Sequence, residues 1–357
     1  MPDEVGAQRE AGRIAWIDVA RGIAISLVVL FHAGMFAVPT GLAPPWWTDL
    51  NLAFALLRMP LFFLLAGALA VGALRRPWPE LWTTRLAVLV WVFVLWTLLR
   101  FLYYRVMPEP IELNQSSVID LVLSVVRPSN GLWFLFALVV FLVVTKLAAG
   151  RTARVIALGV AILSSLVLHS PFTTGNVAYD GILRYYVFFL VGVMFRDRLL
   201  ALVARLSPLA VAGLFAAFVA GLVLRAGTGV VVDIATALPV AAAGALATLG
   251  LARIIAPGRP GPVSALGRPF AHLGSRTLQV YVTHVLVLSA ITSGLLLART
   301  TSLAGVVAVV APVLPLLMAA LAVGASLVIA RAAEALPVTR LLYTAPAWFS
   351  RSAVPAR

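Results

Sequence analysis

Long apolar segments, each about as long as a membrane is thick, dominate this sequence. A hydrocarbon core of about 30 Å requires about 20 apolar residues in a helix. Ten segments qualify as candidate spans, of which the fifth and sixth are short: 14–38, 50–74, 86–104, 131–148, 155–168, 181–195, 207–224, 230–252, 277–298 and 302–330. None has the alternating pattern of a transmembrane barrel strand. The sequence therefore predicts an all-α, polytopic membrane protein with about ten transmembrane helices.

Composition excludes the main alternatives. The chain has 357 residues, of which 62% are hydrophobic and 11% are charged, whereas soluble domains have about 45–50% apolar and about 25% charged residues. A soluble enzyme and a disordered chain are therefore excluded. Because the chain has no cysteine, disulfides, thiolate nucleophiles and cysteine-ligated metals are excluded as well. We expect one integral membrane domain over residues 1–357, with no metal and no permanently bound cofactor.

The basic residues follow the predicted topology. The net charge is +14, and Lys146 is the single lysine among 27 basic residues. If the N-terminus is cytoplasmic, nineteen of them fall in cytoplasmic segments, four in outer loops and four inside spans. This is the positive-inside pattern, so the charge reflects orientation in the bilayer and does not indicate nucleic-acid binding. It predicts cytoplasmic termini, with tails at 1–13 and 332–357, in a cell (inner or plasma) membrane.

Three ionisable residues share one face of the first span. Asp18 and Arg21 are three residues apart, which is close enough for an ion pair. His32 follows Arg21 by eleven positions, which places the two residues about 20° apart around the helix and about 16 Å apart along it. A charge in the bilayer centre costs at least about 2.5 kcal/mol. The stripe therefore indicates either a functional site or a structural ion pair with a separately bonded histidine.

The second span carries an arginine at about the depth of His32. Arg58 lies about two turns below the outer surface, because this span runs inward. Pro60 frees a backbone carbonyl and can kink the helix around Arg58. Arg58 is therefore a candidate for the same site as His32. The alternative is an arginine that snorkels to the outer surface.

Other polar residues in or near the spans are less informative. Arg100, near the outer end of the third span, is consistent with snorkelling. Asp180 and Arg184 are four residues apart at the outer end of the sixth span, which favours a structural ion pair. His284 lies deep in the ninth span, where it serves either an interhelical hydrogen bond or chemistry.

Four motifs occur along the chain in an order that carries a family resemblance. The first motif is the first-span pattern of Asp18, Arg21-Gly22 and His32, with ten residues between the arginine and the histidine. The other three motifs are the segments 58–67, 131–135 and 281–284. Together they resemble the acyltransferase-3 family of integral membrane acyltransferases, whose members have the same number of spans. The chain departs from the family pattern in two places: Ala66 stands where a serine is frequent, and the further arginine often found upstream of Arg58 is missing.

The resemblance implies transfer of an acyl group, often acetyl, from a cytoplasmic coenzyme A thioester. The acceptor in this family is a hydroxyl of a sugar, of a glycan precursor or of another envelope or secreted molecule. The motif residues fall into a catalytic pair, His32 and Arg58, and a set along the path of the substrate or donor, namely Asp18, Arg21, Trp133 and His284.

The residue types fit this chemistry. A hydroxyl nucleophile needs a base that titrates near neutrality, usually a histidine, and His32 is the best-placed one. It serves either as general base in direct transfer or as a carrier of the acyl group. Arg58 supplies positive charge for the oxyanion or binds the acyl carbonyl. Asp18 and Arg21 lie further inward and fit an inner gate or the lining for the pantetheine arm.

Coenzyme A also carries phosphates, which need cations on the cytoplasmic side. The candidates are Arg75, Arg76, Arg259 and Arg268. The competing function is transport, because ten spans with intramembrane Asp, Arg and His can form a proton-coupled carrier or an exporter of a glycan or lipid-linked sugar. An enzyme predicts that His32 and Arg58 converge on a pocket reached by a cytoplasmic tunnel. A carrier predicts a midplane site between pseudosymmetric halves.

Overall fold

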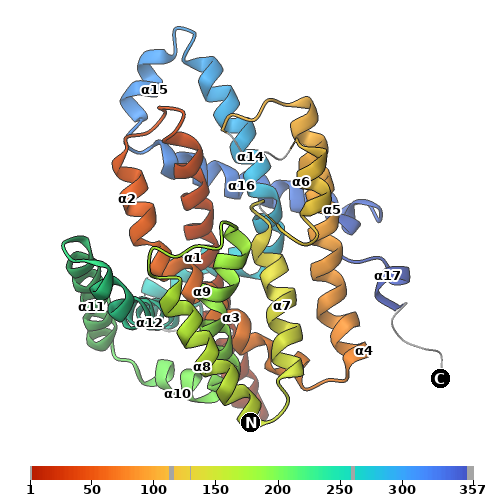
Figure 1. Ribbon diagram of the computed structural model, residues 1–357, viewed down its shortest axis with the longest axis vertical. Helices are drawn as coiled ribbons and strands as arrows, with labels where there is room; N and C mark the ends of the chain where they lie inside the picture. Colours follow the sequence, from red (N-terminus) through yellow and green to blue (C-terminus); the bar gives the residue numbers. More distant parts are fainter. Residues whose placement is uncertain (1, 112–115, 129, 259–261, 352–357) are drawn as a thin grey trace.

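The computed structural model is a bundle of helices over the residues that it describes, 2–111, 116–128, 130–258 and 262–351 (Figure 1). Helix makes up 80% of the structure, and the described residues contain no strand. Within these ranges, eight segments are long and apolar enough to cross a membrane. The all-α, multi-pass architecture expected from the sequence is confirmed, whereas the count of ten spans and the cytoplasmic placement of the termini stay predictions.

The eight membrane-length segments include the helices that carry most of the motif residues. They are the 15–37 part of α1 (Pro2–Ala37); α2 (Trp46–Ala53) with α3 (Ala55–Leu74); α4 (Trp78–Leu81), the π-helical turn η1 (Trp82–Leu86) and α5 (Ala87–Val106); α9 (Val177–Met194); α11 (Pro208–Ala226); α12 (Val230–Ile255); α14 (Thr277–Ala298); and α16 (Leu314–Glu334). Helix α1 begins at Pro2, so the described part of the predicted tail 1–13 is helical.

The remaining helices are shorter. Two of them, α7 (Trp133–Leu147, 15 residues) and α8 (Arg151–Val167, 17 residues), occupy the positions of the predicted fourth and fifth spans. The others are α6 (Val118–Leu123), α10 (Arg196–Arg205), η2 (Pro262–Leu266), α13 (Gly267–Ser275), α15 (Ala304–Val310), η3 (Thr339–Leu342) and α17 (Ala347–Arg351). Figure 1 shows the N-terminus, α4 and α10 at one end of the molecule and α15 at the other.

The predicted last span, 302–330, is not one helix. Helix α15 ends at Val310, and α16 begins at Leu314 after a turn. Pro312 lies in this turn, where its lack of a backbone N–H opposes a continuous helix. Its carbonyl oxygen accepts a hydrogen bond from Trp47 Nε1 at 3.0 Å. The break is therefore fixed by a contact with α2, which the apolar character of the segment does not reveal.

Helix α1 lies at the centre of the bundle. It packs against α3, α12, α13, α14 and α16, and Val19, Ala24, Ile25 and Val29 on it are fully buried. Because so many helices surround α1, its polar stripe faces other protein elements. The first-span motif therefore lies inside the bundle, where neighbouring helices can complete a site around it.

Two helix contacts are close because a glycine faces a backbone. A β-carbon on Gly22 of α1 would lie 2.0 Å from the carbonyl oxygen of Phe270 in α13, and one on Gly67 of α3 would lie 2.1 Å from that of Phe189 in α9. Small residues allow such close approach between membrane helices. Helix α13 belongs to a segment expected to be a cytoplasmic loop, and its contact with Gly22 holds it directly beside Arg21.

The C-terminal segment folds back against α5. The indole N–H groups of Trp91 and Trp96 donate to the carbonyl oxygens of Leu341 and Leu342, both at 2.7 Å. Tyr343 is buried beside them, with its ring stacked on Trp96 at 6.0 Å. A buried indole usually finds an acceptor in this way. The predicted tail 332–357 is thus packed over its described part, and its residues 352–357 lie outside the described ranges.

Candidate active site

Two histidines from distant parts of the chain meet inside the bundle. His284 of α14 places Nε2 3.2 Å from Nδ1 of His32 of α1, and the ring centroids are 4.8 Å apart. Each Nδ1 also faces the carbonyl oxygen four residues earlier in its own helix, that of Val28 at 2.9 Å and that of Val280 at 3.0 Å. His284 is completely buried, whereas His32 is partly exposed and lines a cavity.

The carbonyl contacts assign the protons of the neutral pair. A carbonyl oxygen only accepts, so Nδ1 of each ring carries the proton. His284 Nε2 then accepts from Nδ1–H of His32, which it shares with the carbonyl oxygen of Val28. Nε2 of His32 keeps its lone pair and has no hydrogen-bond partner among the described residues. This form of histidine can take a proton from a hydroxyl or attack a carbonyl carbon.

An outer cavity of about 380 Å³ opens beside His32. His32 and Arg58 both line it, so the two residues converge on one pocket, as an enzyme predicts. The rest of its wall is largely aromatic, with a polar edge near residues 173–177. The main contributors are Phe31, Phe62, Trp133, Phe134, Tyr185 and Tyr281, with Asp180 and Arg184 at the polar edge.

Arg58 faces this cavity and does not snorkel. The residue is 6% exposed, and its guanidinium carbon lies 4.1 Å from the centre of the Phe31 ring, which is a cation–π contact. Among the described residues no carboxylate forms an ion pair with it. The snorkelling alternative is therefore wrong, and the guanidinium donors are available to a molecule in the cavity.

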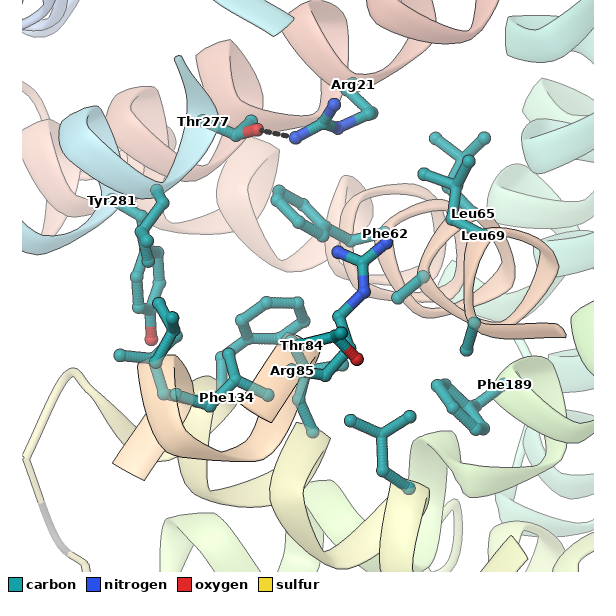
Figure 2. A pocket seen from close by; sticks show the side chains of 18 residues that line it. Arg21, Phe62, Leu65, Leu69, Thr84, Arg85, Phe134, Phe189, Thr277 and Tyr281 are labelled. Atoms are coloured by element: carbon teal, nitrogen blue, oxygen red, sulfur yellow. Dashed lines mark hydrogen bonds between the residues drawn. The ribbon is translucent and has the colours of Figure 1, made fainter. Parts of the chain in front are cut away.

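An inner cavity of about 400 Å³ lies further along the same helices. Arg21 lines it, with Nη1 3.0 Å from Asp18 Oδ1 and Nη2 2.5 Å from Thr277 Oγ1 (Figure 2). The ion pair expected from the spacing of Asp18 and Arg21 is therefore present. Most other wall residues are leucine, alanine or phenylalanine from α3, α5, α7 and α9.

Arg85 is a second cation at the inner cavity. The sequence offered it only as one of the cytoplasmic charges. It lies in η1, the π-helical turn that leads into α5, and such turns are frequent at functional sites. Figure 2 shows its guanidinium reaching into the cavity toward Phe62. No signal in the sequence separates Arg85 from the other arginines predicted to be cytoplasmic, because only tertiary packing, including that of α5 against α7, places it here.

Three aromatic residues form a wall common to both cavities. Phe62, Phe134 and Tyr281 line each of them, with ring centroids 4.7 Å apart between the two phenylalanines and 5.5 Å apart between Phe134 and Tyr281. The Tyr281 hydroxyl donates to the carbonyl oxygen of Gly131 at 2.7 Å. The two cavities therefore lie on either side of this wall, and the tunnel expected between the cytoplasm and His32 stays a prediction.

The residues expected along the path of the donor or substrate separate into three places. Asp18 and Arg21 are at the inner cavity. Trp133 lines the outer one, where its ring stacks on Tyr185 with centroids 6.3 Å apart. His284 lines neither cavity and lies against His32.

Two expectations for other charged residues are wrong. Arg100 does not snorkel, because it is 1% exposed and lies beside the histidine pair. Asp180 does not pair with Arg184. Its carboxylate accepts hydrogen bonds from Thr173 Oγ1 at 2.5 Å and from the N–H of Thr174 at 2.7 Å, and those local donors hold it in the loop.

The arginines expected on the cytoplasmic side to bind phosphates are spread over different parts of the molecule. Arg75 lines a third cavity, of about 700 Å³, whose basic residues also include Arg151, Arg154, Arg196 and Arg198. Arg76 and Arg268 are exposed and line none of the three cavities. Arg259 lies outside the described residues.

The fold and the site define a multi-pass membrane protein with a histidine pair between membrane helices and a cavity on either side of an aromatic wall. A comparison with protein families gives the particular class. The model of the acyltransferase domain of acyltransferase family 3 matches residues 14–331. The chain therefore belongs to this family of acyltransferases, as its four motifs predicted. No curated protein and no solved structure matches the chain.

Proposed function

We propose that this protein transfers an acyl group, in the first instance acetyl, from cytoplasmic acyl-CoA to a hydroxyl of a sugar, a glycan precursor or another envelope or secreted molecule. We place it in the cell (inner or plasma) membrane. The observation that carries the proposal is the free Nε2 of His32, which shares a cavity with Arg58 and is oriented by His284.

In the direct route, His32 is the general base. Its Nε2 takes the proton of the acceptor hydroxyl while the hydroxyl oxygen attacks the thioester carbonyl carbon. The resulting imidazolium can still donate from Nδ1 to His284 and Val28. When the tetrahedral intermediate collapses, the carbon–sulfur bond breaks and the coenzyme A thiolate takes the proton from His32. Arg58 donates to oxygen atoms of the reacting groups from the cavity side.

The donor fits the inner cavity. Its apolar wall suits the pantetheine arm, and the Arg21 guanidinium, fixed by Asp18 and Thr277, can bind the polar groups of that arm. Arg85 adds a second cation in the same cavity. The thioester then reaches His32 past Phe62, Phe134 and Tyr281, whose aromatic edges separate the two cavities.

The acceptor fits the outer cavity. Trp133 and Tyr185 offer aromatic faces for a sugar ring, and the polar edge near Asp180 offers hydrogen-bond acceptors for its hydroxyls. In the second route, His32 Nε2 attacks the thioester carbonyl carbon first, the carbon–sulfur bond breaks, and coenzyme A leaves as the thiolate. His32 then carries the acyl group as a protonated acyl-imidazole until the acceptor hydroxyl displaces it, and the hydroxyl proton neutralises the thiolate. Both routes use the same nitrogen atom.

The test is an acyl-transfer assay on the purified protein in lipid with acetyl-labelled acetyl-CoA. We expect donor turnover in the wild type and loss of about 1000-fold or more in His32→Ala. His272→Ala, at an exposed histidine outside the cavities, is the matched control. Label that remains on the wild-type protein but not on His32→Ala supports the acyl-imidazole route.

Full activity of correctly inserted His32→Ala would contradict the proposal. If acetyl-CoA is neither bound nor turned over, the same preparation is tested with longer acyl-CoA donors. Failure of all donors, together with flux of a glycan or lipid-linked sugar in proteoliposomes, favours a transporter.

A further inference from the structure

Arg100 is a cation buried in the membrane-spanning part of the molecule. It lies on α5, is 1% exposed, and donates from Nη2 to the carbonyl oxygen of Val282 at 3.3 Å. Its Nε and Nη1 are buried and have no hydrogen-bond partner among the described residues. None of the ion pairs within the described ranges includes it. The guanidinium thus keeps two unused donor atoms and an uncompensated charge.

Such a group destabilises a protein unless something else uses it. A buried charge without a counter-ion costs several kcal/mol, and an arginine inside a membrane span is expensive to insert. One hydrogen bond at 3.3 Å to the carbonyl oxygen of Val282 offsets only a small part of that free-energy cost. A leucine or methionine at position 100 would fill part of the same space without the penalty of a buried charge. The energetics therefore point to a role in the reaction.

The position of the unused donors specifies that role. Gly131 lines the outer cavity. A β-carbon on it would lie 3.1 Å from Nη1 of Arg100 and 3.9 Å from Nε2 of His32. Nη1 of Arg100 and Nε2 of His32 therefore both lie within 3.9 Å of the position where Gly131 has a hydrogen atom in place of a side chain.

We propose that Arg100 is a catalytic residue whose Nη1 donates a hydrogen bond to the oxyanion that forms beside His32, in the space left by Gly131. The inference rests on the proposed acyl transfer. Oxygen–carbon bond formation pushes the carbonyl π pair onto the carbonyl oxygen, and the charge of Arg100 stabilises this oxygen until the pair re-forms the carbonyl and the thiolate leaves. Preorganised donors of this kind act most strongly in a water-excluded site.

Arg58 does not make Arg100 redundant. Arg58 approaches from the cavity, over the face of Phe31, where a substrate can displace it. Arg100 is enclosed by protein and is held on the helix carbonyl of Val282, two residues from His284. Its orientation therefore costs little reorganisation when the negative charge develops.

Arg100→Met tests the proposal, because methionine keeps an unbranched side chain and removes the charge. We expect kcat for acyl transfer to fall about 100- to 1000-fold, the usual loss for one oxyanion donor, with little change in KM for the donor. The unfolding temperature in detergent should equal or exceed that of the wild type, since an apolar group replaces an unpaired buried charge. Arg105→Met, at an exposed arginine on the same helix, is the control.

A purely structural role for Arg100 predicts the opposite pattern, with lower stability and unchanged kcat per folded molecule. That pattern overturns the proposal. Arg100→Lys keeps the charge, so this variant should retain more activity than Arg100→Met. Equal losses of activity in the two variants also count against the proposal. If Arg100→Met is fully active while His32→Ala is inactive, the oxyanion role fails and the proposed function stands.

Gly131→Ala gives a second test that leaves both charged groups in place. Its methyl group would occupy the space 3.1 Å from Nη1, so kcat should fall at least about tenfold because the carbonyl oxygen can no longer approach the guanidinium. Gly159→Ala is the matched control, since a β-carbon there meets open space. Full activity of Gly131→Ala would contradict the proposed position of the oxyanion.

Discussion

The imidazole of His284 accepts a hydrogen bond from that of His32 across 3.2 Å and thereby joins α14 to α1. Catalytic histidines are commonly oriented by a carboxylate on the distal nitrogen. Here a second, neutral imidazole takes that place, itself held by the carbonyl oxygen of Val280. The arrangement fixes the tautomer of His32 without placing a negative charge inside the membrane.

This relationship predicts different effects for two substitutions of His284. His284→Ala removes the acceptor and lets the His32 ring rotate, so kcat should fall about 10- to 100-fold. His284→Gln offers an amide oxygen as acceptor and should recover part of that loss. The measurement is steady-state acyl transfer with saturating donor. Equal kcat in wild type and His284→Ala would show that His284 does not orient the base.

Arg21→Lys keeps the charge at the inner cavity but loses the planar group that bridges Asp18 and Thr277. We expect the KM or Kd for acyl-CoA to rise about tenfold, which corresponds to about 1.4 kcal/mol of binding free energy, with a smaller effect on acceptor KM. Arg276→Lys, whose partner Glu334 is partly exposed, is the control. Unchanged donor affinity in Arg21→Lys would remove Arg21 from the donor site.

Acidification should destabilise the protein through His169, which follows α8. Burial lowers the pKa of His169 from 6.5 to about 4, and the nearby charges of Arg184 and Arg225 act in the same direction. The unfolded chain therefore binds this proton first, and the stability present above pH 6.5 is lost as the pH falls toward 4, by at most about 3 kcal/mol. Thermal unfolding in detergent at several pH values measures this loss.

His169→Gln is the control for that experiment. Glutamine does not titrate in this range. The unfolding temperature of the His169→Gln protein should therefore depend less on pH between 6.5 and 4 than that of the wild type. Identical pH profiles for the two proteins would show that another group is responsible.

The packing of the C-terminal segment on α5 predicts a stability effect remote from the site. Trp96→Phe keeps an aromatic side chain but replaces the indole and removes its N–H, which donates to the carbonyl oxygen of Leu342. A carbonyl left without its partner in a buried place costs about 1–3 kcal/mol, so the unfolding temperature should fall while kcat stays the same. Trp78→Phe, at an exposed tryptophan, should have no such effect. A wild-type unfolding temperature in Trp96→Phe would argue against this packing.

Much of the site could be predicted because its residues lie on one helix or at one depth. The helical repeat alone aligns Asp18, Arg21 and His32, and the inward direction of the second span brings Arg58 to the level of His32. Both inferences need only the geometry of single helices in a bilayer. The Asp18–Arg21 ion pair follows from the same local spacing and is present.

Arg100 and His284 could not be assigned in this way. Each is a polar residue in an apolar span, so the sequence marks them as unusual, but their partners lie on other helices. Snorkelling and burial are equally compatible with the position of Arg100 near a helix end, and packing decides between them. The place of Arg85 at the inner cavity could not be predicted either, because no feature of the sequence distinguishes it from the other arginines predicted to be cytoplasmic.

Hydropathy and helical periodicity act over tens of residues, so they are sufficient to predict a helical membrane protein whose first span carries a polar stripe. The family follows separately, from the resemblance of four motifs and from the match over residues 14–331. By contrast, only the packing of the helices brings His284 to His32, places Arg100 beside Gly131 and puts an aromatic wall between two cavities. Helix contacts in a membrane depend on small residues and close backbone approach, such as Gly22 against Phe270, and those contacts join residues far apart in the chain.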